Sequence, residues 1–206
     1  MSDLNKYFDK IFCINLDRRP DRWESVKKEF EKWGITSVER YSAIDGNTIE
    51  NNTNILNGEL GILETHYNLI KKCKDENLDT ILVMEDDVYF TEKIKQIDEY
   101  MDSVPKDWDL LYFGGTHVYG PPPVAINDKV VKITHTVAIH CVAIKKNIFE
   151  PLLLTAKKRQ KQIDVCYAQL QKSFDSYCFH PNIALQTTGF SDIQNKVVDY
   201  NYLIKK

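Results

Sequence analysis

Short apolar runs alternate along this chain with longer stretches of helical periodicity, and no other feature constrains the fold as strongly. Residues 10–16, 80–84 and 109–113 are mostly apolar, and runs of that length and composition are typical of buried strands. Between them, apolar side chains recur every three or four residues, as they do on the buried face of a helix. The alternation predicts an α/β fold in which helices flank a mostly parallel sheet.

The same pattern gives the expected order of elements. We expect strands at 10–16, 38–43, 80–84, 109–113, 130–133, 141–144 and 183–185. We expect helices at 20–33, 59–73 and 91–101, and two more that begin at Asn147 and Asp164, which are good N-cap residues. The Asn-rich stretch 47–58 is predicted to be a loop, and the residues after 185 a polar tail. The 206 residues contain no repeat and no clear linker, so a single domain over 1–206 is predicted.

Charge and hydropathy bear on the partners and location of the protein. Lys and Arg total 27 and Asp and Glu total 30, for a net charge of −3, so no overall charge favours nucleic-acid binding. The apolar runs are much shorter than the roughly 20 residues of a membrane span, and no transmembrane segment is expected. The opening residues lack a signal-peptide pattern, and the five cysteines are scattered without a C-x-x-C pair. We therefore expect a cytoplasmic protein, free or peripheral to a membrane, of undetermined oligomeric state.

Three consecutive carboxylates, Glu85, Asp86 and Asp87, end the most apolar strand. In an open α/β sheet, ligands bind beyond the carboxyl ends of the strands. Carboxylates gathered there repel one another, and removing them from water is costly unless a positive group compensates. Mg²⁺ or Mn²⁺, which take oxygen ligands, would provide that compensation. The alternative is a solvated acidic turn.

The loop after the first strand holds three of the five arginines of the chain, at positions 18, 19 and 22. Guanidinium groups and the N–H groups at the start of a helix both bind phosphate oxygens. The alternative is surface pairing with neighbouring acidic residues such as Asp17 and Asp21. Neither a G-x-G-x-x-G motif nor a P-loop follows this strand, so the dinucleotide-binding and P-loop classes are not expected.

Six segments in order along the chain carry a family likeness. They are Ile14–Arg22 (INLDRRPDR), Ala43–Gly46 (AIDG), Gly58–Tyr67 (GELGILETHY), Leu82–Val88 (LVMEDDV), Asp164–Val165, and Pro181 with Gln186 and Ser191–Ile193. Together they resemble the family 25 glycosyltransferases, which include bacterial lipooligosaccharide β-galactosyltransferases and procollagen galactosyltransferases. Two positions depart from the family pattern: Thr65 replaces a usual Ser, and 140–144 lacks a frequent aromatic. Both bear on sugar or acceptor preference rather than on the fold.

The resemblance implies a single GT-A-like, Rossmann-like glycosyltransferase domain. It implies transfer of a hexose, such as galactose or glucose, from a UDP-sugar to a hydroxyl, with inversion and with Mn²⁺ or Mg²⁺. The acceptor would be a glycan, a lipid-linked sugar or a glycoprotein. One alternative is a non-catalytic relative that binds nucleotide sugars or glycans. Another is a sugar nucleotidyltransferase, which is disfavoured because residues 15–22 lack the glycine-rich loop that such an enzyme should carry.

The resemblance also implies site roles for individual residues. Asp87 is the predicted metal ligand, and Asp192 is predicted to complete the metal site, with His180 and Gln186 as alternatives. The donor nucleotide is predicted to contact Asn15, Leu16, Arg18, Arg22, Asp45, Glu85 and Asp86. For Asp45, which precedes a Gly, the alternative is an ordinary β-turn residue.

The remaining candidates concern the acceptor and the sugar. Asp164 is the predicted general base, with a simple helix N-cap as the alternative. Sugar or acceptor contacts are predicted for His66, Gln186 and Ser191, although His66 could instead be a buried core histidine. Trp108, Tyr112 and Tyr119 are candidates for stacking on a sugar ring. The basic run 157–161 is either a solvated face or a contact for an anionic acceptor or for membrane headgroups.

Overall fold

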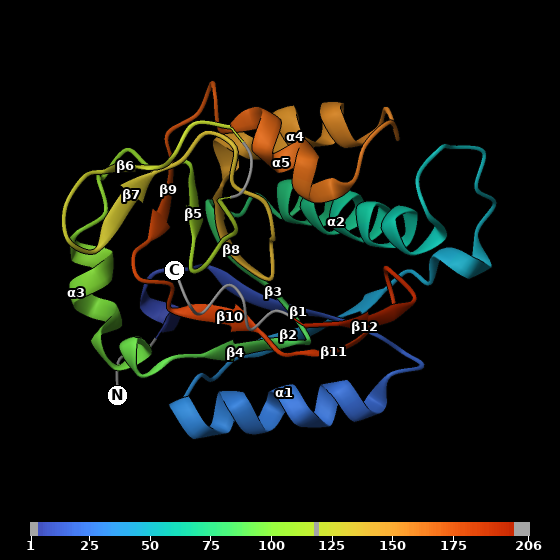
Figure 1. Ribbon diagram of the computed structural model, residues 1–206, viewed down its shortest axis with the longest axis horizontal. Helices are drawn as coiled ribbons and strands as arrows, with labels where there is room; N and C mark the ends of the chain where they lie inside the picture. Colours follow the sequence, from blue (N-terminus) through green and yellow to red (C-terminus); the bar gives the residue numbers. More distant parts are fainter. Residues whose placement is uncertain (1–3, 118–119, 200–206) are drawn as a thin grey trace.

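The computed structural model describes residues 4–117 and 120–199. At its centre lies an eight-stranded sheet in the order β2-β1-β3-β8-β5-β9-β7-β6 (Figure 1). Its strands are β1 (Lys10–Leu16), β2 (Val38–Ala43), β3 (Thr80–Glu85), β5 (Leu110–Tyr112), β6 (Val124–Ala125), β7 (Val130–Lys132), β8 (Cys141–Lys145) and β9 (Ser176–Phe179). Strand β1 runs parallel to β2 and β3, and β5 parallel to β9, whereas β8 is antiparallel to both β3 and β5. The α/β prediction is confirmed, with antiparallel strands making the sheet mixed.

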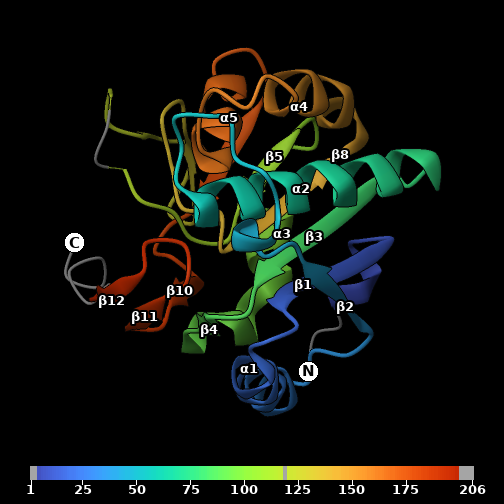
Figure 2. The same cartoon turned by 90° about the vertical axis from the view of Figure 1, so that its right-hand side faces the viewer.

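Helices cover both faces of the sheet (Figure 2). On one face lie α2 (Asn57–Asp75), α4 (Phe149–Ala156) and α5 (Ile163–Leu170), and on the other α1 (Pro20–Trp33) and α3 (Ile97–Asp102). Because side chains alternate along a strand, Phe12 and Ile14 pack into the first core and Ile11 and Cys13 into the second. None of the helices in the described part of the chain is long and apolar enough to cross a membrane.

Local sequence accounts for the bounds of β1 and α1, which match the prediction. Pro20 occupies the start of α1, where its missing N–H costs no helical hydrogen bond. Gly34 ends the helix in the left-handed conformation at φ +67°, and its N–H bonds the carbonyls of Phe30 and Glu31. The loop 17–19 between β1 and α1 is thereby held between two well-defined ends.

The C-terminal part of the chain is more ordered than a polar tail. Strand β10 (Ala184–Gln186) pairs antiparallel with β4 (Val88–Phe90), and β11 (Gly189–Ser191) pairs with β12 (Lys196–Val198). The Thr187 N–H donates to the Asp87 carbonyl at 2.8 Å. This hydrogen bond joins the acidic triplet to a segment about a hundred residues later in the chain.

Two predicted helix starts are wrong in detail. The helix predicted at 91–101 is a 3₁₀ turn (Glu92–Gln96) that continues into α3. Asn147 does not cap α4, because its Nδ2 donates to Asp109 Oδ1 at 3.0 Å, and α4 begins at Phe149 without a side-chain cap. Both differences lie away from the carboxyl ends of β1 and β3.

Candidate active site

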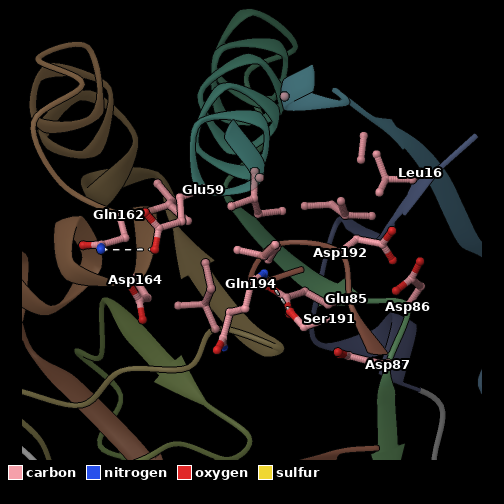
Figure 3. A pocket seen from close by; sticks show the side chains of 18 of the residues that line it. Leu16, Glu59, Glu85, Asp86, Asp87, Gln162, Asp164, Ser191, Asp192 and Gln194 are labelled. Carbon is pink, nitrogen blue, oxygen red and sulfur yellow. Dashed lines mark hydrogen bonds between the residues drawn. The ribbon is translucent and has the colours of Figure 1, made fainter. Parts of the chain in front are cut away.

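A cavity of about 350 Å³ opens beyond the carboxyl ends of β1, β2 and β3. It lies where the strand–ligand rule for α/β sheets places a binding site, and Figure 3 shows it from close by. Most of the predicted site residues line it: Asn15, Leu16, Arg18, Arg22, Asp45, Glu85, Asp86, Asp87, Asp164, Gln186, Ser191 and Asp192. The fold thus brings together residues from the first strand and from the last hairpin of the described chain.

Arg22, in the first turn of α1, binds two of the three carboxylates of the acidic triplet. Its Nη1 lies 3.0 Å from Asp86 Oδ1, and its Nη2 lies 3.1 Å from Asp87 Oδ2. Burial raises the pKa of Asp86 to about 6, against the opposing effect of Arg22. Burial, reinforced by the charges of Asp87 and Asp86, raises the pKa of Glu85 well above its usual range. Arg22 therefore offsets only part of the cost of burying Glu85 and Asp86 together.

Asp87 carries a second oxygen that nothing satisfies. Its Oδ1 is buried and has no hydrogen-bond partner among the described residues. A buried carboxylate oxygen left in this way is suited to a hard cation. No group of three or more His, Cys, Asp or Glu side chains in the described ranges is arranged to hold a metal. A single carboxylate such as Asp87 is compatible in chemistry with an ion such as Mg²⁺, because proteins often hold that ion through one or two carboxylates together with substrate phosphates.

Asp192, in the turn that follows β11, is surrounded by arginines. Its Oδ1 accepts from Arg18 Nη1 at 2.6 Å, its Oδ2 accepts from Arg19 Nη1, and Arg22 Nη1 lies 3.8 Å from Oδ2. Only 7% of the Asp192 side chain is exposed. Arg18 also donates through Nε to Asp45 Oδ2 at 2.5 Å. The predicted metal ligand is thus engaged by three guanidinium groups. Arg19 itself does not line the cavity, and its Nε and Nη2 donate to Asp21, as the surface-pairing alternative predicts for this arginine.

Asn15 is buried, and both its amide nitrogen and its amide oxygen form hydrogen bonds that position neighbouring residues. Its Nδ2 donates to Asp86 Oδ2 at 2.6 Å and to the Arg19 carbonyl at 3.0 Å, and its Oδ1 accepts from Arg40 Nε at 2.9 Å. Arg40, on β2, was not expected at the site. Arg40 is a charged residue within a strand, and its closeness to Asn15 follows only from the pairing of β2 with β1. Asn15 therefore connects the arginine loop with the acidic triplet.

Asp164 lies on the side of the cavity opposite Asp87 and Asp192 (Figure 3). It is the second residue of α5, and the cap position belongs to Gln162, so the N-cap alternative is wrong. Its Oδ1 accepts the Val165 N–H at 2.7 Å, and burial raises its pKa. Gln162 Nε2 donates to Glu59 Oε1 at 3.3 Å beside it. Neither Glu59 nor Gln162 was predicted as a site residue.

The two histidine candidates lie outside the cavity. His66 is fully buried on α2, where Nδ1 lies 3.1 Å from the Tyr167 hydroxyl and Nε2 has no partner among the described residues. Burial lowers its pKa to about 3, so His66 is a neutral core residue and not a sugar contact. His180 is exposed and does not line the cavity, and its backbone N–H donates to the Lys129 carbonyl. It is therefore not placed as a metal ligand.

The aromatic candidates also pack elsewhere. Tyr112 and Trp108 are buried in the cores and do not line the cavity, and Tyr119 lies outside the described residues. Gln186 does line it, and its Nε2 lies 3.4 Å from Glu85 Oε2. Ser191 lines it as well, and its Oγ accepts the Gln194 N–H at 3.2 Å. Polar residues of the C-terminal segment therefore line the cavity, and the aromatic candidates Trp108 and Tyr112 do not.

Thr65 has a structural role behind the cavity. Its hydroxyl donates to the Gly61 carbonyl at 2.7 Å and accepts the Ile44 N–H at 2.9 Å. It thereby fixes the backbone next to Asp45. Both hydrogen bonds are made by the hydroxyl group. Ser and Thr both carry a hydroxyl group, so Thr in place of Ser preserves this arrangement.

Gly58 lets α2 approach the loop that carries Asp192. A Cβ on Gly58 would lie 2.6 Å from both Cα and O of Ile193 and 2.9 Å from the Asp192 carbonyl. No side chain fits there without a backbone shift. The first turn of α2 and the Asp192 loop therefore form one wall of the cavity.

Comparisons with known proteins identify the family. A sequence model described as glycosyltransferase family 25 (LPS biosynthesis protein) matches residues 8–152, which is more than two thirds of the chain. The chain belongs to glycosyltransferase family 25. The matched range includes the arginine loop and the acidic triplet, whereas Asp164, Gln186 and Asp192 lie beyond it.

Curated relatives agree with this assignment, and a solved structure shares the fold. Procollagen galactosyltransferase 2 of Homo sapiens and procollagen galactosyltransferase 1 of Danio rerio are each 29% identical over 130 residues, covering 52% of this chain. The aligned region is 21% of each relative, so the family 25 chain spans about a fifth of their length. A crystal structure of a glycosyltransferase involved in the glycosylation of the major capsid of PBCV-1 aligns with a TM-score of 0.55 at 10% identity, over 96% of this chain and 98% of that one. That likeness shows a GT-A-like fold.

Proposed function

We propose that this protein is an inverting glycosyltransferase that transfers a hexose, such as galactose or glucose, from a UDP-sugar to a hydroxyl of a glycan or glycosylated acceptor with the help of Mn²⁺ or Mg²⁺. One observation carries the proposal. In a family 25 chain, one cavity has guanidinium groups and the Asp87 carboxylate on one side, with an oxygen that has no partner among the described residues, and a half-buried carboxylate, Asp164, on the other. These are the groups that a displacement at the anomeric carbon requires.

The donor diphosphate would bind at the arginine side of the cavity. Arg18 and Arg22 line it, and Arg22 lies in the first turn of α1. Guanidinium groups form paired hydrogen bonds with phosphate oxygens. As the bond to the sugar breaks, negative charge develops on the departing UDP, and fixed positive groups that meet it lower the barrier. Asp45, bonded to Arg18, lies where it could contact the ribose or base.

Asp87 is the residue that would hold the divalent cation. Its Oδ1 offers a buried oxygen without another partner among the described residues, and Gln186 or Asp192 would be the second protein ligand. A cation bound there would neutralise charge on the leaving diphosphate. Glu85 and Asp86 would bind the ribose or a water of the cation, with Asn15 and Arg22 holding Asp86 in place.

Asp164 would act as the base. The acceptor oxygen forms its bond to the anomeric carbon, the bond from that carbon to UDP breaks on the opposite face, and the hydroxyl proton passes to the Asp164 carboxylate. A raised pKa improves Asp164 as a proton acceptor. Its place across the cavity from Asp87 fits attack opposite the leaving group, and such a single displacement inverts the configuration.

A donor screen tests the proposal. The full chain is incubated with UDP-galactose, UDP-glucose and UDP-N-acetylglucosamine in Mn²⁺, in Mg²⁺ or in EDTA, and released UDP is measured. We expect metal-dependent release from at least one hexose donor, and a β-configured product by NMR from an α-configured donor. Binding of donors without any release would indicate the non-catalytic alternative, and formation of pyrophosphate from UTP and a sugar phosphate would indicate a nucleotidyltransferase. Either result would overturn the proposal.

A further inference from the structure

The turn between α4 and α5 carries a local concentration of positive charge. Lys157, Lys158, Arg159 and Lys161 fall within five residues, and all four are exposed. The chain as a whole has a net charge of −3, so this turn departs in sign from the average surface. Lysines clustered in solvent repel one another unless salt or a bound anion screens them.

The turn is held in a defined conformation. The Lys157 and Arg159 N–H groups donate to the carbonyls of Leu153 and Ala156, both at 2.9 Å. Arg159 adopts a left-handed backbone at φ +51° and donates through Nε to Glu64 Oε1 at 2.6 Å. The turn is thereby fixed against the N-terminal half of α2 (Figure 1).

Within the described residues, the three lysines of this turn make no ion pair with the protein, in contrast to Arg159. Arg159 forms an ion pair with Glu64. The charges of Lys157, Lys158 and Lys161 remain available to a ligand. An ammonium group on a flexible stem acts as a point charge that can follow an anion of undetermined orientation. Three such groups on a fixed turn can meet one anionic group together.

The lysine turn adjoins the base side of the cavity. Gln162, Ile163 and Asp164, which follow Lys161 directly, all line the cavity. Figure 3 shows Gln162 and Asp164 on the side away from the acidic triplet. The turn therefore adjoins the wall that an acceptor would meet if its hydroxyl reached Asp164. Asp164 and Glu59 at that wall would repel a negatively charged acceptor, and the lysines offset this repulsion.

We propose that Lys157, Lys158 and Lys161 form an acceptor subsite for an anionic group, a phosphate or a carboxylate, carried by the sugar chain near the reacting hydroxyl. The inference rests on the proposed function, because it takes Asp164 as the residue that meets the acceptor. It specifies the class of acceptor: a saccharide that carries a negatively charged group, rather than a neutral saccharide.

The test is a binding comparison between charged and neutral saccharides. Glucose 6-phosphate and 6′-sialyllactose, with glucose and lactose as neutral counterparts, are titrated into the full chain at low salt and followed by NMR. We expect the charged probes to bind more tightly, and the substitution of Lys157, Lys158 and Lys161 together by Gln to weaken them about tenfold, since each exposed charge contributes modestly. The control substitutes Lys28, Lys93 and Lys106, which are exposed on other elements, by Gln and should change binding less than about twofold by the same reasoning. Equal binding of charged and neutral probes, or equal effects of the two triple variants, would overturn the subsite.

A second arm distinguishes an acceptor subsite from a membrane contact and from the donor site. Sedimentation with phosphatidylcholine vesicles containing phosphatidylglycerol shows whether the lysines recognise a membrane surface, and vesicle binding without binding of charged saccharides would overturn the proposal. UDP titrated into the unsubstituted chain reports on the donor site alone. If UDP and Mn²⁺ fail to bind while the charged saccharides bind through the lysines, the proposed function fails and the anion subsite stands.

Discussion

Asp192 gives the three arginines of the first loop an internal anion. Its carboxylate meets Arg18, Arg19 and Arg22 from the turn after β11, in the place where a donor phosphate would bind. A carboxylate and a phosphate both form paired hydrogen bonds with guanidinium groups. Donor binding as proposed would therefore involve an exchange, in which the phosphate competes with Asp192 for the same guanidinium groups.

This exchange leads to a prediction for Asp192→Asn. Removing the negative charge frees the guanidinium groups, so the affinity for UDP in EDTA should rise by about fivefold, as expected from the loss of competing ion pairs. Isothermal titration of UDP with and without Mn²⁺ measures it. An unchanged affinity in EDTA, together with lost Mn²⁺-dependent binding, would instead assign Asp192 to the metal.

Asp87→Asn tests the metal ligand. The Oδ1 atom of Asp87 is buried without a partner among the described residues, and an amide is a much poorer ligand for a hard cation than a carboxylate. We expect Mn²⁺ to stop strengthening UDP binding, while binding in EDTA persists. Asp128→Asn serves as the control, because Asp128 is 84% exposed on another part of the surface. If Mn²⁺ enhanced UDP binding equally in both variants, the ligand would lie elsewhere.

Asp164→Asn tests the base. An Asn side chain can still accept the Val165 N–H that Asp164 accepts, so the fold and donor affinity should persist while transfer falls by about 10²–10⁴-fold. Since the base works only when deprotonated, and burial raises the Asp164 pKa above 3.8, activity of the unmodified protein should fall on acidification at a higher pH than for an ordinary aspartate. Rates against pH, with UDP affinity measured in parallel, check this. Near-normal transfer by the variant would move the base to another residue.

At the scale of elements, the sequence predicts those parts whose signals are local. The bounds of β1 and α1 match the prediction because an apolar run, Pro20 and Gly34 mark them directly. Strand β4 has only three residues and no visible period, and it exists because β10 pairs with it. The hairpin of β11 and β12 is likewise polar enough to resemble a tail. Pairing between distant segments decides these elements, and a single sequence does not display it.

The same reasoning separates the correct from the incorrect site residues. Residues at the carboxyl ends of strands could be assigned to a common cavity because strand polarity fixes which edge they share. His66 could not be placed, because a histidine on an apolar helical stripe has the same pattern whether it faces a ligand or a core. Its burial against Tyr167 settles the point.

Gly58→Ala tests how α2 supports the Asp192 loop. In a helix this change usually stabilises a protein by about 0.5–1 kcal/mol. Here the added Cβ meets backbone atoms of Ile193 at 2.6 Å, so the loop must move. We expect a lower melting temperature and faster amide hydrogen exchange in 189–198. Gly189→Ala, in the same hairpin, has no atom within 4 Å of the new Cβ and should leave both measures nearly unchanged. Equal behaviour of the two variants would contradict the role of Gly58.

At the scale of the whole molecule, the two halves of the chain contribute different parts of the site. The range matched by the family model contains the arginine loop and the acidic triplet. The later segments bring Asp164 on α5 and Asp192 on the hairpin. Although the net charge of the chain is small, charged residues are concentrated around one cavity, to which both parts of the chain contribute.

The pH dependence of global stability tests the packing between α2 and α5. His66 has a native pKa of about 3 against an ordinary value of 6.5, so the unfolded chain binds a proton that the native protein does not. Between these values, the contribution of His66 to the free energy of unfolding falls as pH falls, by up to about 1.4 kcal/mol per pH unit. Asp86 acts in the opposite sense, because its pKa is raised to about 6, so the total slope alone does not isolate His66.

His66→Gln isolates it. Gln remains neutral and can still bond the Tyr167 hydroxyl, so the variant should be less stable than the unmodified protein near pH 7. The difference should shrink, by up to about 1.4 kcal/mol per pH unit, as the pH is lowered from about 6.5 towards about 4. Urea unfolding at a series of pH values measures this, and His180→Gln, at an exposed histidine, is the control. A difference that stays constant with pH would mean that His66 is protonated in the native protein and that the core between α2 and α5 admits water.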